Sequence, residues 1–230
     1  MRLLAAVLAV MALAGSVLAA SSFVIAVDGS GSMKDKFNGT VKFEIARDAA
    51  ICMLDSMQEG DEGAIFVFED SHTVTRAHSF TTSKGALRSA LQGMDSEFGS
   101  TDLGSGINVS ATYLLSDGKN QNKFLVVVSD GGDARAVINE TAAYFRDQGV
   151  RLEVVGVGVR STDRAGKVLA GIAENGGGRF YSTLDYSEPC GAFSGAYDNG
   201  VRGGGGLCPL FFLLPAAIVL LLTTRYTRSC

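Results

Sequence analysis

Uninterrupted apolar runs alternate along the chain with segments whose apolar residues recur at helical spacing. Short runs rich in Val, Ile, Leu and Phe predict buried strands at 23–27, 64–68, 124–128, 152–159 and 180–182. The alternating pattern of 72–80 predicts a more exposed edge strand. The helical spacing predicts helices at 41–57, 83–94, 103–116, 135–148 and 163–174.

Continuous apolar strands separated by amphipathic helices are typical of a mostly parallel sheet with helices on both faces. The predicted fold class is therefore α/β, with a doubly wound, Rossmann-like sheet. In such sheets ligands bind beyond the carboxyl ends of the strands, near the point where the strand order reverses. A functional site is thus expected in the loops that directly follow the strands.

The two ends of this body have a different pattern. Residues 1–20 begin with Arg2, continue as an apolar run and end in small residues, which predicts a secretory signal peptide. A retained N-terminal membrane helix is the alternative. Residues 185–206 are rich in glycine and lack apolar periodicity, which predicts a flexible stalk. The folded domain is therefore expected at 21–184.

An uncharged apolar segment follows the predicted stalk. Residues 207–224 are near the lower length limit for a membrane-spanning helix, and Arg225 and Arg228 in the tail 225–230 suit a cytoplasmic end. We therefore expect a C-terminal transmembrane segment in a single-pass type I protein at the cell surface, with an extracellular domain. A GPI-anchor signal that starts at the small residues 194–196 is a second interpretation, and a buried core helix is a third.

Side chains that carry oxygen follow the first buried strand. The strand runs directly into Asp28, Ser30 and Ser32. The intervening residues are Gly29 and Gly31, which let the backbone turn sharply so that the three side-chain oxygens converge. Taken alone, such Asp-Gly and Ser-Gly pairs are also ordinary turns.

Two further loops carry the same kind of side chain. The buried strand FLVVV is followed by Asp130 and Gly131, and the loop before a predicted helix contains Thr101 and Asp102. Carboxylate and hydroxyl oxygens are hard ligands that suit Mg²⁺, Mn²⁺ or Ca²⁺ and not zinc or copper. Because few of these ligands are carboxylates, a bound ion would stay electrophilic and attract a further carboxylate from outside.

The order of these motifs, DxSxS, then Thr in a GST-type loop, then SDGG, resembles a von Willebrand factor type A (vWA) domain with a complete metal-ion-dependent adhesion site (MIDAS). The resemblance covers about residues 22–184. It implies a six-stranded sheet with one antiparallel edge strand, in which the first and fourth strands lie side by side. The residues that it assigns to the metal ion are Asp28, Ser30, Ser32, Thr101 and Asp130.

The resemblance also implies a function in adhesion or recognition. The ion would receive an Asp or Glu of a protein ligand, and the loops around Gly29, Gly31, Asp102 and Gly131 would select the partner. A membrane-anchored binding module is thus the expected function, and an enzyme is not expected, because no nucleophile with an orienting base accompanies the ion. The alternative is an assembly or scaffolding subunit of an envelope or membrane protein complex.

Composition and single residues exclude further classes of protein and suggest possible modifications. A formal net charge of -4 over 230 residues argues against a nucleic-acid partner. Four cysteines are too few for a scaffold built on disulfides. Cys52 is expected to be a small buried hydrophobic residue, and Cys190 and Cys208 form a candidate pair. Glycosylation sequons, which would make a glycoprotein in a eukaryotic host, begin at Asn38, Asn108 and Asn139.

Overall fold

The computed structural model describes residues 19–70, 73–95, 99–131, 137–185 and 187–203. Most of the predicted signal peptide, the predicted membrane segment 207–224 and the tail 225–230 lie outside the described residues. The fold centres on one six-stranded sheet with the order β5-β4-β1-β6-β7-β8. Its strands are β1 (Ser21–Asp28), β4 (Glu62–Phe68), β5 (Val74–Thr81), β6 (Asn122–Ser129), β7 (Val150–Gly156) and β8 (Gly177–Ser182).

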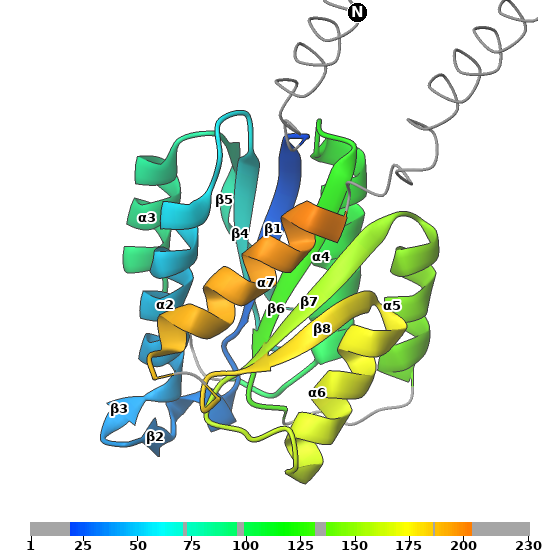
Figure 1. Ribbon diagram of the computed structural model, residues 1–230. Coiled ribbons are helices and arrows are strands. Elements are labelled where there is room, and N and C mark those ends of the chain that lie inside the picture. Colours follow the sequence, from blue (N-terminus) through cyan, green and yellow to red (C-terminus); the bar gives the residue numbers. More distant parts are fainter. Residues whose placement is uncertain (1–18, 71–72, 96–98, 132–136, 186, 204–230) are drawn as a thin grey trace, which may run out of the picture.

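Five of the strands run parallel, and only β5, at one edge, runs antiparallel to its neighbour β4. Helices cover both faces of this sheet (Figure 1). One face carries α2 (Lys42–Ser56), α3 (Lys84–Gln92) and α7 (Pro189–Gly203), and the other carries α4 (Leu103–Asp117), α5 (Val137–Asp147) and α6 (Arg164–Asn175). The predicted α/β fold class is confirmed, including the antiparallel edge strand.

Strand β1 shows why this sequence needs a cover on both faces. All eight of its residues are buried. Successive side chains of a strand point to opposite faces, so Phe23 and Ile25 enter the core under α2, α3 and α7. Val24 and Ala26 enter the core under α4, α5 and α6. The apolar run therefore fixes β1 in the middle of the sheet, with β4 and β6 on either side.

Residues 189–203, which we expected to be part of a flexible stalk, form the helix α7. The stalk prediction is wrong for these residues, and the folded domain extends past residue 184. Ala192, Phe193, Ala196 and Tyr197 of this helix are all buried in the core that covers one face of the sheet. The backbone lies close to the sheet at Gly200, where a Cβ would lie 2.5 Å from the ring of Phe124.

Polar side chains of the sheet also hold α7 in place. The amide of Asn122, at the start of β6, donates to Ser21 Oγ at 2.8 Å and to the carbonyl oxygens of Gly200 and Val201 at 3.2 and 3.3 Å. The first residue of β1 and the last turns of α7 thus meet at one residue of β6. Asn199 Nδ2 in turn donates to Glu153 Oε1 of β7 at 2.7 Å.

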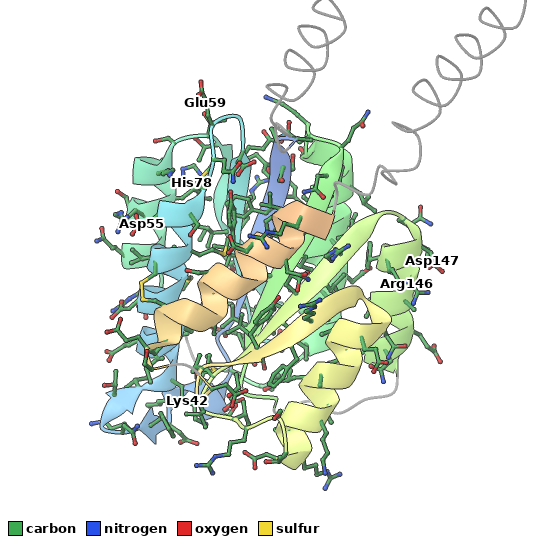
Figure 2. All side chains as sticks on the ribbon, viewed as in Figure 1. Lys42, Asp55, Glu59, His78, Arg146 and Asp147 are labelled. Carbon is green, nitrogen blue, oxygen red and sulfur yellow. A yellow bond between two sulfur atoms is a disulfide. The ribbon has the colours of Figure 1, made fainter. Side chains whose placement is uncertain are left out.

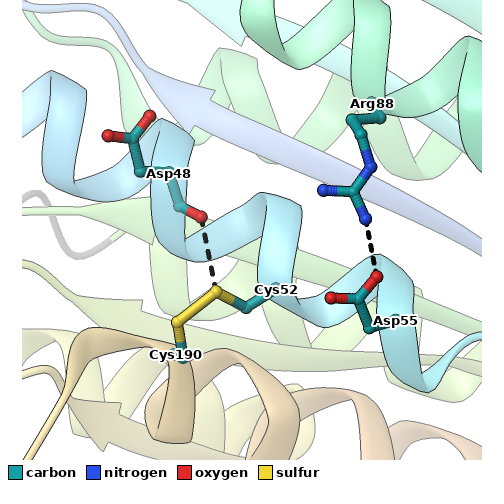
Figure 3. Close-up of a disulfide and its surroundings, with 5 residues drawn as sticks. All are labelled: Asp48, Cys52, Asp55, Arg88 and Cys190. Atoms are coloured by element: carbon teal, nitrogen blue, oxygen red, sulfur yellow. Dashed lines mark hydrogen bonds and ion pairs between the residues drawn. A yellow bond between two sulfur atoms is a disulfide. The ribbon is translucent and has the colours of Figure 1, made fainter.

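A disulfide joins α7 to α2 (Figure 3). It links Cys52 to Cys190, with Cα atoms 5.5 Å apart. Cys52 was expected to be a small buried hydrophobic residue, but it is half-buried and forms a disulfide. Cys190 pairs with it and not with Cys208, which lies outside the described residues. Disulfides persist in oxidising compartments.

The predicted localisation at a membrane needs correction. Over the part of the chain that the structure describes, no helix combines the length and the apolar character needed to cross a bilayer. A single-pass membrane anchor is therefore not supported.

Glu153 carries a fully buried carboxyl on β7, the strand next to the edge strand β8. Burial raises the pKa of Glu153 above its ordinary value of 4.5, although hydrogen bonds from the Arg179 amide and from Asn199 oppose the rise. Folding therefore favours the protonated acid, and the free energy of unfolding falls as the pH rises from 4.5 through the raised pKa.

A Glu153→Gln variant is neutral at every pH, so it escapes this loss. We expect its stability relative to the wild type to increase as the pH rises through that window, as measured by urea denaturation at a series of pH values. Glu174→Gln, at an exposed position of α6, is the matched control. Parallel pH profiles of wild type and Glu153→Gln would contradict the prediction.

Candidate functional site

The strand order reverses at β1, which lies between β4 and β6. The chain passes from β1 to β4 on one side and later returns through β6 on the other, so the loops after β1 and β6 diverge from a shared edge. Strands β1 and β6 are parallel and in register up to Val27 and Val128. Asp28 and Asp130 therefore leave the sheet at the same end, on neighbouring strands.

Asp28 is fully buried at the end of β1. Its Oδ1 accepts a hydrogen bond from the Ser30 amide at 2.8 Å, and its Oδ2 accepts one from Ser129 Oγ at 2.6 Å. Burial raises the pKa of the Asp28 carboxyl, and the charge of Asp130 acts in the same direction. The two hydroxyls and the amide of this turn oppose that rise.

The side chains of Ser30, Ser32 and Asp130 form a continuous hydrogen-bonded chain. The hydroxyls of Ser30 and Ser32 lie 3.3 Å apart, and Ser32 Oγ donates to Asp130 Oδ1 at 2.8 Å. Ser30 is fully buried and Asp130 nearly so, whereas Ser32 is half-buried. Three of the predicted ligands thus contact one another, and the fourth, Asp28, bonds to the backbone of Ser30.

The fifth predicted ligand, Thr101, lies in the loop that ends at α4. This loop is tied to the first one by a hydrogen bond of 2.7 Å from the Gly31 amide to the Gly99 carbonyl. Within the described residues, no hydrogen bond joins the Thr101 hydroxyl to the other four side chains. The neighbouring Asp102 is the N-cap of α4 and accepts a hydrogen bond from the Ser105 amide at 2.9 Å.

Gly131 directly follows Asp130 in the loop after β6. Its φ is +82°, a conformation that favours glycine, and a Cβ at this position would lie 2.8 Å from Ala165 Cβ. Its amide donates to Ser129 Oγ at 3.0 Å. The glycine therefore lets the chain turn tightly after Asp130 while Ser129 remains hydrogen-bonded to Asp28.

One residue of the site was missed in the sequence: Lys42, the first residue of α2. Its Nζ donates to Asp130 Oδ2 at 2.8 Å and to the carbonyl oxygen of Ser32 at 3.4 Å. Figure 2 shows Lys42 at the end of the molecule that carries the short strands β2 (Lys36–Phe37) and β3 (Thr40–Val41). These two strands form a hairpin with the two-residue turn Asn38-Gly39, in which both residues have positive φ.

The donor set suits a hard divalent cation, although it contains few carboxylates. Among the described residues no three His, Cys, Asp or Glu side chains gather into a metal-binding group. The arrangement instead pairs two carboxylates, Asp28 and Asp130, with the hydroxyls of Ser30 and Ser32. Such a mixed oxygen set fits Mg²⁺ or Mn²⁺, which keep several waters and take few protein carboxylates.

Comparisons with known proteins bear on the domain type. Residues 23–132 match the family model described as von Willebrand factor type A domain. No curated protein matches the chain. The crystal structure of an aerotolerance-related membrane protein from Bacteroides fragilis is similar, with a TM-score of 0.67 and 18% identity over 79% of this chain and 99% of that one.

Two further solved structures have the same fold. The protein BatB from Bacteroides thetaiotaomicron aligns with a TM-score of 0.64 and 18% identity, over 80% of this chain and 98% of that chain. The SpRpn10 VWA domain aligns with a TM-score of 0.59 and 14% identity, over 77% of this chain and 93% of that chain. The solved structures thus confirm the predicted fold, and the match to the vWA family model covers residues 23–132. The metal site stays a prediction.

Proposed function

We propose that this von Willebrand factor type A domain binds a divalent cation and captures a protein partner through an Asp or Glu of that partner. The observation that carries the proposal is the meeting of Asp28 and Asp130 at the switch point of the sheet, with two serine hydroxyls between them. The proposed ligands of the ion are Asp28, Ser30, Ser32, Thr101 and Asp130, and the proposed ion is Mg²⁺, with Mn²⁺ or Ca²⁺ as substitutes.

The electrostatics of the site support a cation. Burying a carboxylate is costly unless a partner compensates its charge, and Asp28 is buried with only neutral donors among its hydrogen bonds of 2.6 and 2.8 Å. The neighbouring Asp130 adds to that cost. A divalent cation between the two carboxylates would favour the ionised form of both.

The bound ion would supply an electrophilic position that accepts a carboxylate of the partner. The chain's own loops would choose that partner, because Gly31 is exposed beside the site and Thr101 and Asp102 are half-exposed. We propose binding without catalysis: in the described site the serine hydroxyls contact carboxylates directly, with no histidine between them to act as a base.

A second candidate function is an assembly or scaffolding subunit of a larger protein complex. The salt bridge of 2.8 Å between Lys42 and Asp130 favours it, since it gives one carboxylate of the site a cationic partner without any metal. The loops would then bind a partner whether or not an ion is present. Removal of divalent cations separates the two candidates, because only the first depends on them.

The hydroxyl of Thr101 offers the cleanest test, because it takes no part in the hydrogen bonds that hold the other ligands together. In Thr101→Val a methyl group replaces the hydroxyl at nearly constant volume. We expect isothermal titration calorimetry on the full-length chain to show Mg²⁺ affinity reduced about 10- to 100-fold, as for other lost contributors to metal sites. The melting temperature without metal should not change.

Thr75→Val, at an exposed position of the edge strand β5, is the matched control and should bind Mg²⁺ like the wild type. Capture of an acidic side chain is tested with two synthetic peptides that differ by one Glu→Gln replacement, each with Mg²⁺ and with EDTA. Equal Mg²⁺ binding by wild type and Thr101→Val, or no Mg²⁺ binding by the wild type, would contradict the proposed site.

A further inference from the structure

The ammonium group of Lys42 contacts the carboxylate that the proposed metal ion would need. We propose that Lys42 is an internal counter-ion of the site, which neutralises Asp130 when no metal is bound and opposes the binding of a divalent cation. This inference rests on the proposed function and adds a regulating residue to it. It is carried by the contacts of Lys42 Nζ with Asp130 Oδ2 at 2.8 Å and with the Ser32 carbonyl at 3.4 Å.

The local fold brings Lys42 to the site. The β2–β3 hairpin turns the chain back after Ser32, and a hydrogen bond of 3.0 Å from the Lys42 amide to the Asp35 carbonyl closes it. Helix α2 begins directly at Lys42. A positive charge in the first turn of a helix is unfavourable, because the helix dipole is positive there. The position of Lys42 is therefore better explained by its contact with Asp130 than by the stability of α2.

The side chain of Lys42 is enclosed and not free to extend into water. Its exposed fraction is 18%, and that of Asp130 is 6%. A Cβ at Gly158, in the loop after β7, would lie 3.6 Å from Lys42 Cε and 3.5 Å from the ring of Phe37. The hydrocarbon stem thus lies between the hairpin and this loop. Shielded ion pairs of this kind are much less weakened by solvent than exposed ones.

A divalent cation and the ammonium group compete for the same carboxylate. Asp130 uses Oδ1 to accept from Ser32 and Oδ2 to accept from Lys42. An ion bound to Asp130 would lie within a few ångströms of a positive charge, where like charges repel strongly in a partly buried site. Cation binding must therefore either displace the Lys42 ammonium or pay for its repulsion, and both lower the affinity.

Removal of the charge should strengthen metal binding. The variant Lys42→Met keeps the length and apolar stem of the side chain and loses the ammonium group. We expect calorimetric titration of the full-length chain with MgCl₂ and with MnCl₂ to give an affinity at least about tenfold higher than in the wild type. Lys36→Met makes the same change of net charge at an exposed position of the hairpin and should leave the affinity unchanged.

A second measurement tests the role of Lys42 without metal. In EDTA, Lys42→Met should melt several degrees below Lys36→Met, because it leaves the carboxylate of Asp130 without its cationic partner. Saturating Mg²⁺ should raise the melting temperature of Lys42→Met by more degrees than that of Lys36→Met. Equal melting temperatures of the two variants in EDTA would overturn the counter-ion role.

The titrations separate this inference from the proposed function. If the wild type and both variants bind Mg²⁺ equally, or if Lys42→Met binds more weakly, Lys42 does not oppose the ion and the inference is overturned while the metal site stands. If only Lys42→Met binds, the inference is supported and the proposed function of the wild type fails. If none of the three binds either ion, both are overturned.

Discussion

Replacement of both Cys52 and Cys190 by serine is expected to lower the free energy of unfolding by about 4 to 5 kcal/mol. The two residues are 138 positions apart in the sequence, so their bond closes a long loop and removes much of the conformational entropy of the unfolded chain. The bond also fixes the start of α7 against the middle of α2. Urea denaturation of wild type and variant measures the difference.

The single variants Cys52→Ser and Cys190→Ser are the internal controls. Each alone already breaks the bond, so the double variant should be hardly less stable than either of them. The wild type in reductant should unfold at about the same urea concentration as the double variant. A double variant as stable as the oxidised wild type would show that the bond does not form or does not matter.

Truncation of Tyr197 to alanine is expected to cost about 3 to 5 kcal/mol, which is the usual loss for a large aromatic side chain in a core. Tyr197 lies in α7 and is 1% exposed. Its ring packs against those of Phe23 and Phe124, with centroids 6.1 and 5.9 Å away. Its hydroxyl donates to Asp61 Oδ2 and accepts from the Gln58 amide at 3.0 Å.

The variant Tyr197→Phe separates the hydroxyl from the ring. Burial and the adjacent Asp61 raise the pKa of the Tyr197 hydroxyl, which therefore stays protonated and keeps donating. Its removal should cost about 1 to 3 kcal/mol, because the buried Asp61 loses a donor. Tyr144→Ala on α5, where the side chain is 59% exposed, should change the stability by no more than about 0.5 kcal/mol. Equal losses for Tyr197→Ala and Tyr144→Ala would mean that α7 is not packed on the domain.

The central sheet could be predicted from the sequence because its strands are uninterrupted apolar runs. The segment 23–27 of β1 is apolar throughout and buried on both faces, so its pattern does not resemble that of an amphipathic helix or a loop. The amphipathic helices between the strands indicate that the strands run parallel. The expectation that Asp28 and Asp130 meet came from the resemblance to the vWA family, which implies that the first and fourth strands are neighbours. Neighbouring parallel strands end at the same edge of the sheet, so their two loops lie together.

Helix α7 was not predicted because its glycine content resembles that of a flexible linker. The frequent glycines between Pro189 and Gly203 indicated a flexible segment. The buried residues of the helix nevertheless recur at helical spacing, at Ala192, Phe193, Ala196, Tyr197 and Val201. Gly200 lies where a side chain would clash with Phe124, and Asn199 donates to the buried carboxyl of Glu153. Contacts between distant parts of the chain cannot be deduced from such a segment alone.

Lys42 was missed for a different reason, although a signal was present. Asn38-Gly39 between two short extended segments is a strong indication of a hairpin, and we interpreted Asn38 only as a glycosylation sequon. Recognition of the turn would have shown that the chain reverses after Ser32. The pairing of Lys42 with Asp130 could still not have been predicted without the structure, because 88 positions separate the two residues in the sequence.

The meeting of Ser21, Val201 and Asn122 has a consequence for how the domain can be joined to other proteins. The start of β1 and the end of α7 lie at one end of the domain, and the loops after β1 and β6 lie at the opposite end (Figure 1). Because its two ends are close together, the domain could be inserted into a single surface loop of another protein. A fluorescent protein fused at either end would lie at the opposite end from the loops after β1 and β6, so it would not block a partner that binds to those loops.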